Sequence, residues 1–150
     1  MVMMGFLVAL TFTFLGFHLG VAMSQTQPLN LDDYRWQNRI IMLFAPSAEH
    51  PDFTLQLKEL AQYKTEVEER DLKVFKVFET TGSLDEHALS EEEIRFLRAQ
   101  HDAVPQAFTF ILVGKDGGVK RRSNSVVAAA DLFAQIDSMP MRQREMREGD

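Results

Sequence analysis

The sequence predicts an α/β fold: a four-stranded mixed sheet flanked by helices, in the order strand, helix, strand, helix, strand, strand, helix. Three observations predict it. Short apolar runs over 40–44, 72–78 and 107–113 are typical of buried strands. Apolar residues at three- and four-residue steps separate and follow these runs, as in helices that cover a sheet. The chain of 150 residues is long enough for one domain with one core.

Composition and charge exclude several classes of function. The net charge is −6 and the calculated pI is about 5.2, whereas nucleic-acid-binding domains usually carry a basic face. The chain has no cysteine. A disulfide, a thiol nucleophile, a thiolate metal ligand and a Cys-x-x-Cys redox pair are therefore all excluded.

The N-terminal segment predicts export. Val2–Met23 is apolar, and the small residues Ala22 and Ser24 fit a signal-peptide cleavage site. We expect a signal peptide over 1–24, cleaved after Ser24, and a polar linker over 25–33. The alternative is an uncleaved membrane anchor, because the run is long enough to span a bilayer. Both interpretations place the domain outside the cytoplasm, in the periplasm or secreted.

The domain is predicted over 34–140, and we expect Trp36, near its start, to pack over one edge of the core. Ile40–Phe44 is the first strand. Residues 52–70 then predict one helix, with Pro51 and Asp52 suited to its start. Residues 72–78 predict a strand buried on both faces, parallel to the first.

Thr80–Leu89 is predicted as a loop. Ser90 and Glu93 then have the spacing of a capping box, which begins a helix on which Arg95 and Arg98 point away from the core. Val104–Pro105 leads into the third strand.

The end of the domain is predicted as a hairpin and a helix. Asp116–Gly117 supplies the turn of an antiparallel hairpin, and Lys120–Arg122 lies on an edge strand where charge discourages further pairing. Asn124–Ser125 is expected to cap a helix over 127–138. Residues 141–150 are a charged tail, helical in part.

The loop after the first strand is the candidate binding site. Right-handed crossovers place the first strand inside the sheet, with the second and third strands on either side. The loop therefore leaves the carboxyl end of this strand where the strand order reverses, which is the usual ligand crevice of an open α/β sheet. Its candidate residues are Ser47, Ala48, Glu49, His50 and Pro51.

Three stretches resemble a bacterial family of exported, thioredoxin-like domains of unknown function, related to domains of secreted animal extracellular-matrix proteins. They are Leu31–Trp36 with the strand after it, Leu112–Lys120 and Asp131–Arg144. In addition, Phe44–Pro46 resembles the strand end before a thioredoxin active site, and Val104–Pro105 resembles the start of its cis-proline strand. The resemblance covers roughly 31–147.

The resemblance implies a thioredoxin-like fold and a cis bond before Pro105. It also places Ala48 and Pro51 about where thioredoxin carries its two cysteines. Without thiols the chain cannot perform disulfide exchange or thiol peroxidase chemistry, because both require a thiolate. Fold alone does not assign any other activity.

Two hypotheses for function follow. The first is an exported module without redox activity that binds a protein, a peptide or an envelope component, with neither a cofactor nor a metal. The backbone beside Pro105 would pair with an extended peptide by strand addition. The second is a small non-thiol enzyme or a metal-dependent activity centred on Ser47–Pro51, where Ser47, Glu49 and His50 have the residue types of a nucleophile, an acid and a base.

Overall fold

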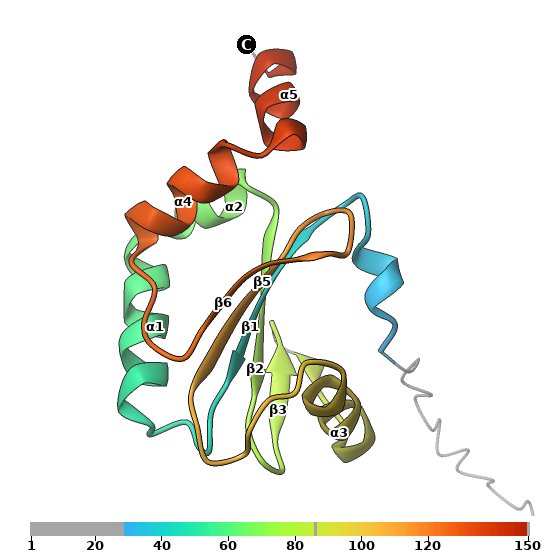
Figure 1. Ribbon diagram of the computed structural model, residues 1–150, viewed down its shortest axis with the longest axis vertical. Helices are drawn as coiled ribbons and strands as arrows, with labels where there is room; N and C mark the ends of the chain where they lie inside the picture. The colour runs from blue at the N-terminus through green and yellow to red at the C-terminus, as the bar shows by residue number, and fades with distance from the viewer. Residues whose placement is uncertain (1–28, 86, 150) are drawn as a thin grey trace, which may run out of the picture.

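The computed structural model describes residues 29–85 and 87–149, and the predicted signal peptide lies outside them. The described chain forms one mixed sheet with strand order β4-β3-β2-β1-β5-β6, with helices on both faces (Figure 1). The strands are β1 (Arg39–Phe44), β2 (Leu72–Val77), β3 (Gly82–Leu84), β4 (His87–Ala88), β5 (Thr109–Val113) and β6 (Val119–Ser123). The helices are the short 3₁₀ helix η1 (Leu31–Tyr34), α1 (Pro51–Gln62), α2 (Lys64–Glu69), α3 (Glu91–Gln100), α4 (Ala129–Asp137) and α5 (Pro140–Glu148).

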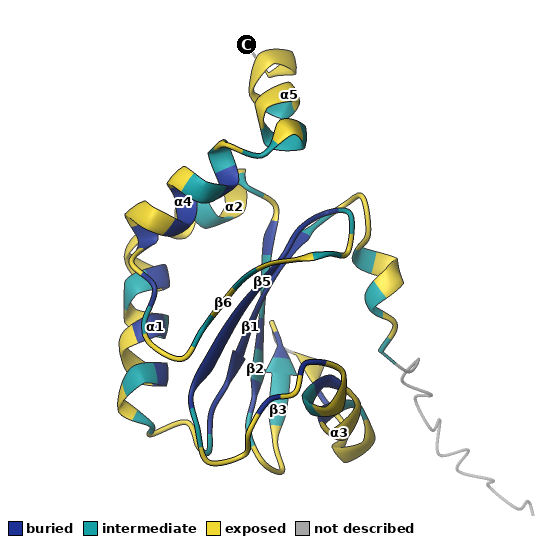
Figure 2. Cartoon of the chain, in the orientation of Figure 1, coloured by how far each residue is buried: buried dark blue, intermediate teal, exposed yellow. Residues whose placement is uncertain are grey.

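Strand β1 lies inside the sheet, as predicted. It runs parallel to β2 on one side and antiparallel to β5 on the other, so the crossover argument holds for β2 but not for β5. All six of its residues are buried, and Figure 2 shows both β1 and β5 buried along their whole length. Such a strand needs apolar side chains on both faces, which explains the uninterrupted run over 40–44.

The side chains of β1 alternate between two cores. Ile41 and Leu43 pack under α1 and α4, together with Phe53 and Leu132. Residues 40, 42 and 44 pack on the other face, under α3 and η1. Figure 1 shows the two groups of helices on opposite sides of the sheet. The domain is therefore three layers thick, with the sheet as the shared middle layer.

The prediction of four strands was incomplete, because the predicted loop 80–89 contains β3 and β4. These strands pair antiparallel beyond β2 and form the edge of a six-stranded sheet. They are three and two residues long, too short to show the alternating pattern from which strands are recognised. Leu84 and Leu89 are buried there and extend the core under α3.

Replacing Gly82 by Ala is expected to destabilise the fold by about 1–3 kcal/mol through overpacking. A Cβ at this position would lie 2.8 Å from the Lys76 carbonyl oxygen and 3.1 Å from Leu89 Cδ1. Urea unfolding of Gly82→Ala measures the loss. Gly118→Ala is the control, because its Cβ would meet no atom closer than 3.4 Å. Equal stability of the two variants would contradict the expected clash.

The capping box of α3 is confirmed, but the predicted cap of α4 is wrong. The Ser90 hydroxyl accepts from the Glu93 N–H, and the Glu93 carboxylate accepts from the Ser90 N–H. Helix α4 starts at Ala129 without a side-chain cap of its own. The Glu59 carboxylate of α1 accepts from the Ala129 N–H at 2.9 Å instead. A side chain distant in sequence thus replaces the local cap.

The buried Gln56 of α1 makes the same kind of tertiary bond. Its side chain accepts from the Val127 N–H at 2.7 Å and donates to the Val127 carbonyl at 3.0 Å. The N–H and the carbonyl of Val127, which is also buried, are therefore both satisfied by the Gln56 side-chain amide.

The helix predicted over 52–70 is in fact two helices, α1 and α2, because the backbone leaves the helical conformation at Tyr63.

Trp36 does not pack over the core, contrary to prediction. Its side chain is exposed, and its φ of 65° places it at the turn into β1. Tyr34 packs against the core instead, with its ring edge-on to Phe75 at 5.8 Å between centroids.

The hairpin prediction is confirmed: β5 and β6 are antiparallel, Gly117 has a φ of 82°, and β6 is an edge strand.

Helix α5 occupies residues predicted as a charged, partly helical tail, and none of its residues is buried. Its contacts with the domain include ion pairs. The Glu145 carboxylate accepts from the Arg39 guanidinium at 3.1 and 3.2 Å and from Lys115 Nζ at 2.9 Å. Arg142 of α5 donates to Asp137 at 3.3 Å and to the Glu69 carbonyl at 2.9 Å. We call these contacts the α5 ion-pair network.

Candidate functional site

The candidate loop, Ala45–Pro51, lies at the carboxyl end of β1. Ser47, Ala48 and Glu49 are exposed. The Ser47 hydroxyl accepts from the Glu49 N–H at 3.3 Å, which holds the loop in a tight turn. A side-chain hydrogen bond with Ser47 lowers the pKa of the Glu49 carboxyl, so this exposed group is an anion at neutral pH.

His50 closes the loop and turns toward the domain. It stands directly before the first residue of α1, and its ring stacks on that of Phe108 at 6.3 Å and 13°. Its Nδ1 is buried and has no hydrogen-bond partner among the described residues. The described residues show no hydrogen bond between the His50 ring and the Ser47 hydroxyl. The arrangement therefore brings Ser47 and Glu49 together but does not pair a base with the candidate nucleophile.

The predicted cis bond before Pro105 is wrong, because the described residues contain no cis peptide bond. The trans form is the default for an X-Pro bond whose surroundings do not impose the other isomer. Val104 and Pro105 form an exposed turn, which is closed by the Ala107 N–H donating to the Val104 carbonyl at 3.3 Å. Phe108, directly before β5, is buried beneath His50.

Arg98 connects the candidate loop to this turn, and sequence reasoning missed it. Its guanidinium donates to the carbonyls of Ala45 at 3.0 Å, Phe78 at 3.1 Å and Ala103 at 3.5 Å. It also lies over the Phe44 ring, 5.8 Å from the centroid. The prediction that Arg98 points away from the core is therefore wrong.

The role of Arg98 follows from its position. Ala45 directly follows β1, Phe78 directly follows β2, and Ala103 lies in the loop after α3. One side chain therefore fixes three segments that border the site. Burial lowers the pKa of the Arg98 guanidinium, although the nearby Glu79 carboxylate raises it. Arginine stays charged in proteins under all ordinary conditions. In the sequence, the spacing of Arg98 along the helix is that of an exposed residue, so nothing local indicates that it binds these carbonyls.

A shallow hollow of about 400 Å³ lies beside the turn and is lined by Arg98, Ala99 and Asp102–Pro105. Val104 on its rim is 59% exposed. No group of three or more His, Asp or Glu side chains within 29–85 and 87–149 has the geometry of a metal site. The helices of the same residues include none long and apolar enough to cross a membrane.

Comparisons with known proteins agree with this fold. A family model described as "Domain of unknown function (DUF4174)" matches residues 30–145. Coiled-coil domain-containing protein 80 of Danio rerio is 27% identical over an alignment of 133 residues that covers 77% of this chain. The match covers 15% of that protein, so the chain corresponds to a small part of it.

Among solved structures, the chain is similar to peroxiredoxins. The reduced 2-Cys peroxiredoxin of Plasmodium vivax has a TM-score of 0.58 and 11% identity, over 79% of this chain and 85% of that one. Thioredoxin peroxidase I of Plasmodium yoelii has a TM-score of 0.52 and 16% identity, over 80% and 81%. At these identities the likeness shows the thioredoxin-like fold alone. The absence of cysteine separates this chain from thiol chemistry.

Proposed function

Because this chain belongs to the DUF4174 family and has a thioredoxin-like fold without a single cysteine, we propose that it is a binding module without redox activity. Its ligand is a protein, a peptide or an envelope component, and it binds an extended segment of that ligand. We also propose that the module acts after export, as the apolar run Val2–Met23 predicts.

The observation that carries this proposal is an exposed, partly apolar surface on a fixed base. The surface consists of Ser47–Glu49 and Val104–Gln106, all exposed. Arg98 and the stacked pair of His50 and Phe108 hold it from beneath. A surface fixed in this way loses little conformational entropy when a partner binds, which favours affinity.

The chemistry of the surface favours a peptide. The Val104 side chain and the Pro105 ring offer apolar contact area beside the hollow. The backbone of the turn and of the candidate loop offers hydrogen-bonding groups to an extended chain. Glu49 adds one negative charge, so a peptide with a basic residue beside an apolar one is the best match.

Replacing Val104 by Asp is expected to weaken binding of such peptides at least tenfold. The change puts a charge into the apolar part of the surface, while an exposed side chain contributes little to the fold. An array of extended peptides, followed by titration of the strongest binders, measures the effect. The matched control is Val119→Asp on β6, where the valine is 53% exposed at the other end of the sheet.

Two outcomes would contradict the proposal. One is that no peptide binds the wild-type chain, and the other is that the two valine variants bind equally well. The alternative function is a non-thiol enzyme or metal-dependent activity of this loop. A variant with Ser47, Glu49 and His50 all changed to Ala distinguishes it from peptide binding. Under that alternative, the triple change abolishes turnover or metal uptake, whereas Val104→Asp leaves both intact.

A further inference from the structure

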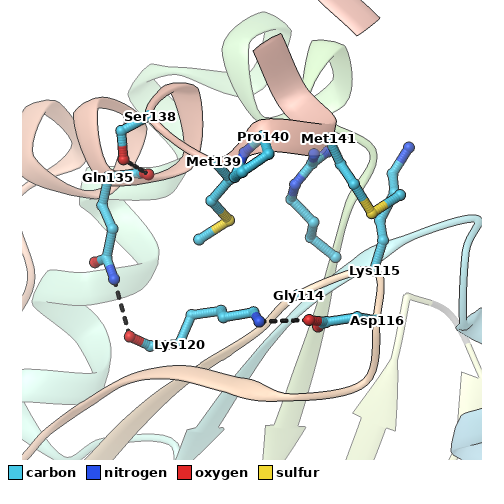
Figure 3. A pocket seen from close by; sticks show the side chains of 10 residues that line it. Gly114, Lys115, Asp116, Lys120, Gln135, Ser138, Met139, Pro140 and Met141 are labelled. Carbon is cyan, nitrogen blue, oxygen red and sulfur yellow. Dashed lines mark hydrogen bonds and ion pairs between the residues drawn. The ribbon is translucent and has the colours of Figure 1, made fainter. Parts of the chain in front are cut away.

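A separate cavity lies at the other end of the sheet, between the β5–β6 hairpin and the junction of α4 and α5 (Figure 3). Its volume is about 500 Å³, within the range of pockets that bind small molecules. Arg39, which lines it, is the first residue of β1, whereas the candidate loop follows the last. Arg39 and Ala45, the first residue of the loop, are about 20 Å apart along the strand, at about 3.3 Å per residue.

Two opposite walls of this cavity differ in character. Met139, Pro140 and Met141 form the wall on the helix side, and Figure 3 shows them across the cavity from Lys120 and Asp116 of the hairpin. Methionine side chains are flexible and polarisable, and they adapt to apolar ligands of different shapes. The arrangement therefore suits a molecule with an apolar body and a polar group at one side.

The polar wall is mainly cationic. Arg39, Lys115 and Lys120 line the cavity, and Asp116 is the one acidic residue among the lining side chains. Lys115 is engaged by Asp71 and Glu145. Lys120 binds Asp116, yet its side chain is 32% exposed and an ammonium has three donors. Lys120 is therefore the cation that a bound anion reaches most readily.

Arg39 adds a buried donor without a partner. Its side chain is 1% exposed, and its two terminal nitrogens donate to the Arg70 carbonyl and to Glu145. Its Nε has no hydrogen-bond partner among the described residues. This Nε is itself fully buried, so Arg39 contributes positive charge beneath the cavity surface and not a donor that an occupant reaches. Glu145 already shows that a carboxylate binds the other side of this guanidinium.

We propose that this cavity binds a small molecule with an apolar body and one carboxylate. The apolar body lies against Met139 and Met141. The carboxylate accepts from Lys120, and the buried guanidinium of Arg39 belongs to the same cationic wall. This site is independent of the peptide-binding surface proposed above, and neither requires the other.

The test uses octanoate as the probe and compares it with octylammonium and 1-octanol, which share its chain length but not its charge. Methyl NMR of methionine-labelled full chain follows each titration. Octanoate is expected to shift the Met139 and Met141 methyl signals saturably, and to bind at least tenfold more tightly than either comparison probe. Lys120→Gln is expected to weaken octanoate at least fivefold, and Arg144→Gln, an exposed site outside the cavity with the same change of charge, to leave it unchanged.

Three results would overturn the proposal: no saturable shift of these two methyls, octylammonium binding as tightly as octanoate, or unchanged octanoate affinity in Lys120→Gln. The comparison of probes on the wild-type chain requires no substitution. It therefore decides the question even if a variant folds poorly.

Discussion

Replacing Glu145 by Gln is expected to lower the free energy of unfolding by about 2–3 kcal/mol. Removing one partner of a buried ion pair leaves the other charge uncompensated, at a cost of about 3–5 kcal/mol. Here the Arg39 side chain is buried, but the Glu145 side chain is 25% exposed, so water screens part of the interaction. Lys115 also keeps Asp71 as a partner, at 2.7 Å. The expected cost therefore lies at or below the lower end of that range.

The same carboxylate makes the stability depend on pH. Burial raises the pKa of Glu145, but hydrogen bonds from Arg39 and Lys115 outweigh this and hold its pKa below the ordinary value of 4.5. A group with a depressed folded-state pKa stabilises the fold above its unfolded pKa, and this contribution is lost as the pH falls through the folded value. We therefore expect the difference between wild type and Glu145→Gln to be full at pH 7 and to shrink below about pH 4.5.

Urea unfolding of wild type and Glu145→Gln at pH 7, 5 and 3 measures both effects. Glu148→Gln serves as the control, because Glu148 is an exposed residue of the same helix with no ion pair within the described part of the chain. A constant difference between wild type and Glu145→Gln at all three pH values would show that the carboxylate charge is not what stabilises the fold.

Replacing Arg98 by Met is expected to cost about 3 kcal/mol or more. Hydrogen bonds from charged donors contribute about 1.5–3 kcal/mol each, and Arg98 donates to several partly buried carbonyls. Methionine keeps much of the side-chain volume but leaves the carbonyls of Ala45 and Phe78 without this donor. The loss should also loosen the candidate loop, because Ala45 is its first residue.

Urea unfolding measures the stability of Arg98→Met, and amide hydrogen exchange of residues 45–50 and 104–107 measures the local effect. Arg95→Met, exposed on the same helix, is the control for helix propensity and charge. A destabilisation within about 0.5 kcal/mol of the control, the usual range for surface changes, would exclude the role assigned to Arg98.

The features predicted correctly from sequence have local causes. The capping box at Ser90 and the turn at Asp116–Gly117 each depend on residues a few positions apart. The burial of β1 on both faces follows from its uninterrupted apolar run. These signals are complete within a short window of sequence, and the structure confirms them.

The features that were missed depend on contacts between distant residues. Gln56 reaches the backbone of Val127, 71 positions away, and Arg98 reaches Ala45, 53 positions away. Both are polar residues on helices, so residue type and spacing alone predict that their side chains are exposed. The prediction for Trp36 was wrong in the opposite direction, because a residue expected to be buried is exposed. A large apolar residue is normally buried, but the position of Trp36 in the turn before β1 leaves it in solvent. At the candidate site, the loop was predicted correctly in position, but the side chain that fixes it was not.

Helix α5 has no buried residue and is held to the domain by the α5 ion-pair network. These two properties determine where the molecule unfolds first. Local unfolding proceeds first where little apolar surface must be exposed. We therefore expect α5 to open as a local unit before the sheet does. The ion pairs that hold this unit depend on the Glu145 carboxylate, so protonation of that group at low pH loosens the unit while the sheet stays intact. The detachment of α5 would open one wall of the methionine-lined cavity, so that access to its interior depends on the acidity of the surroundings.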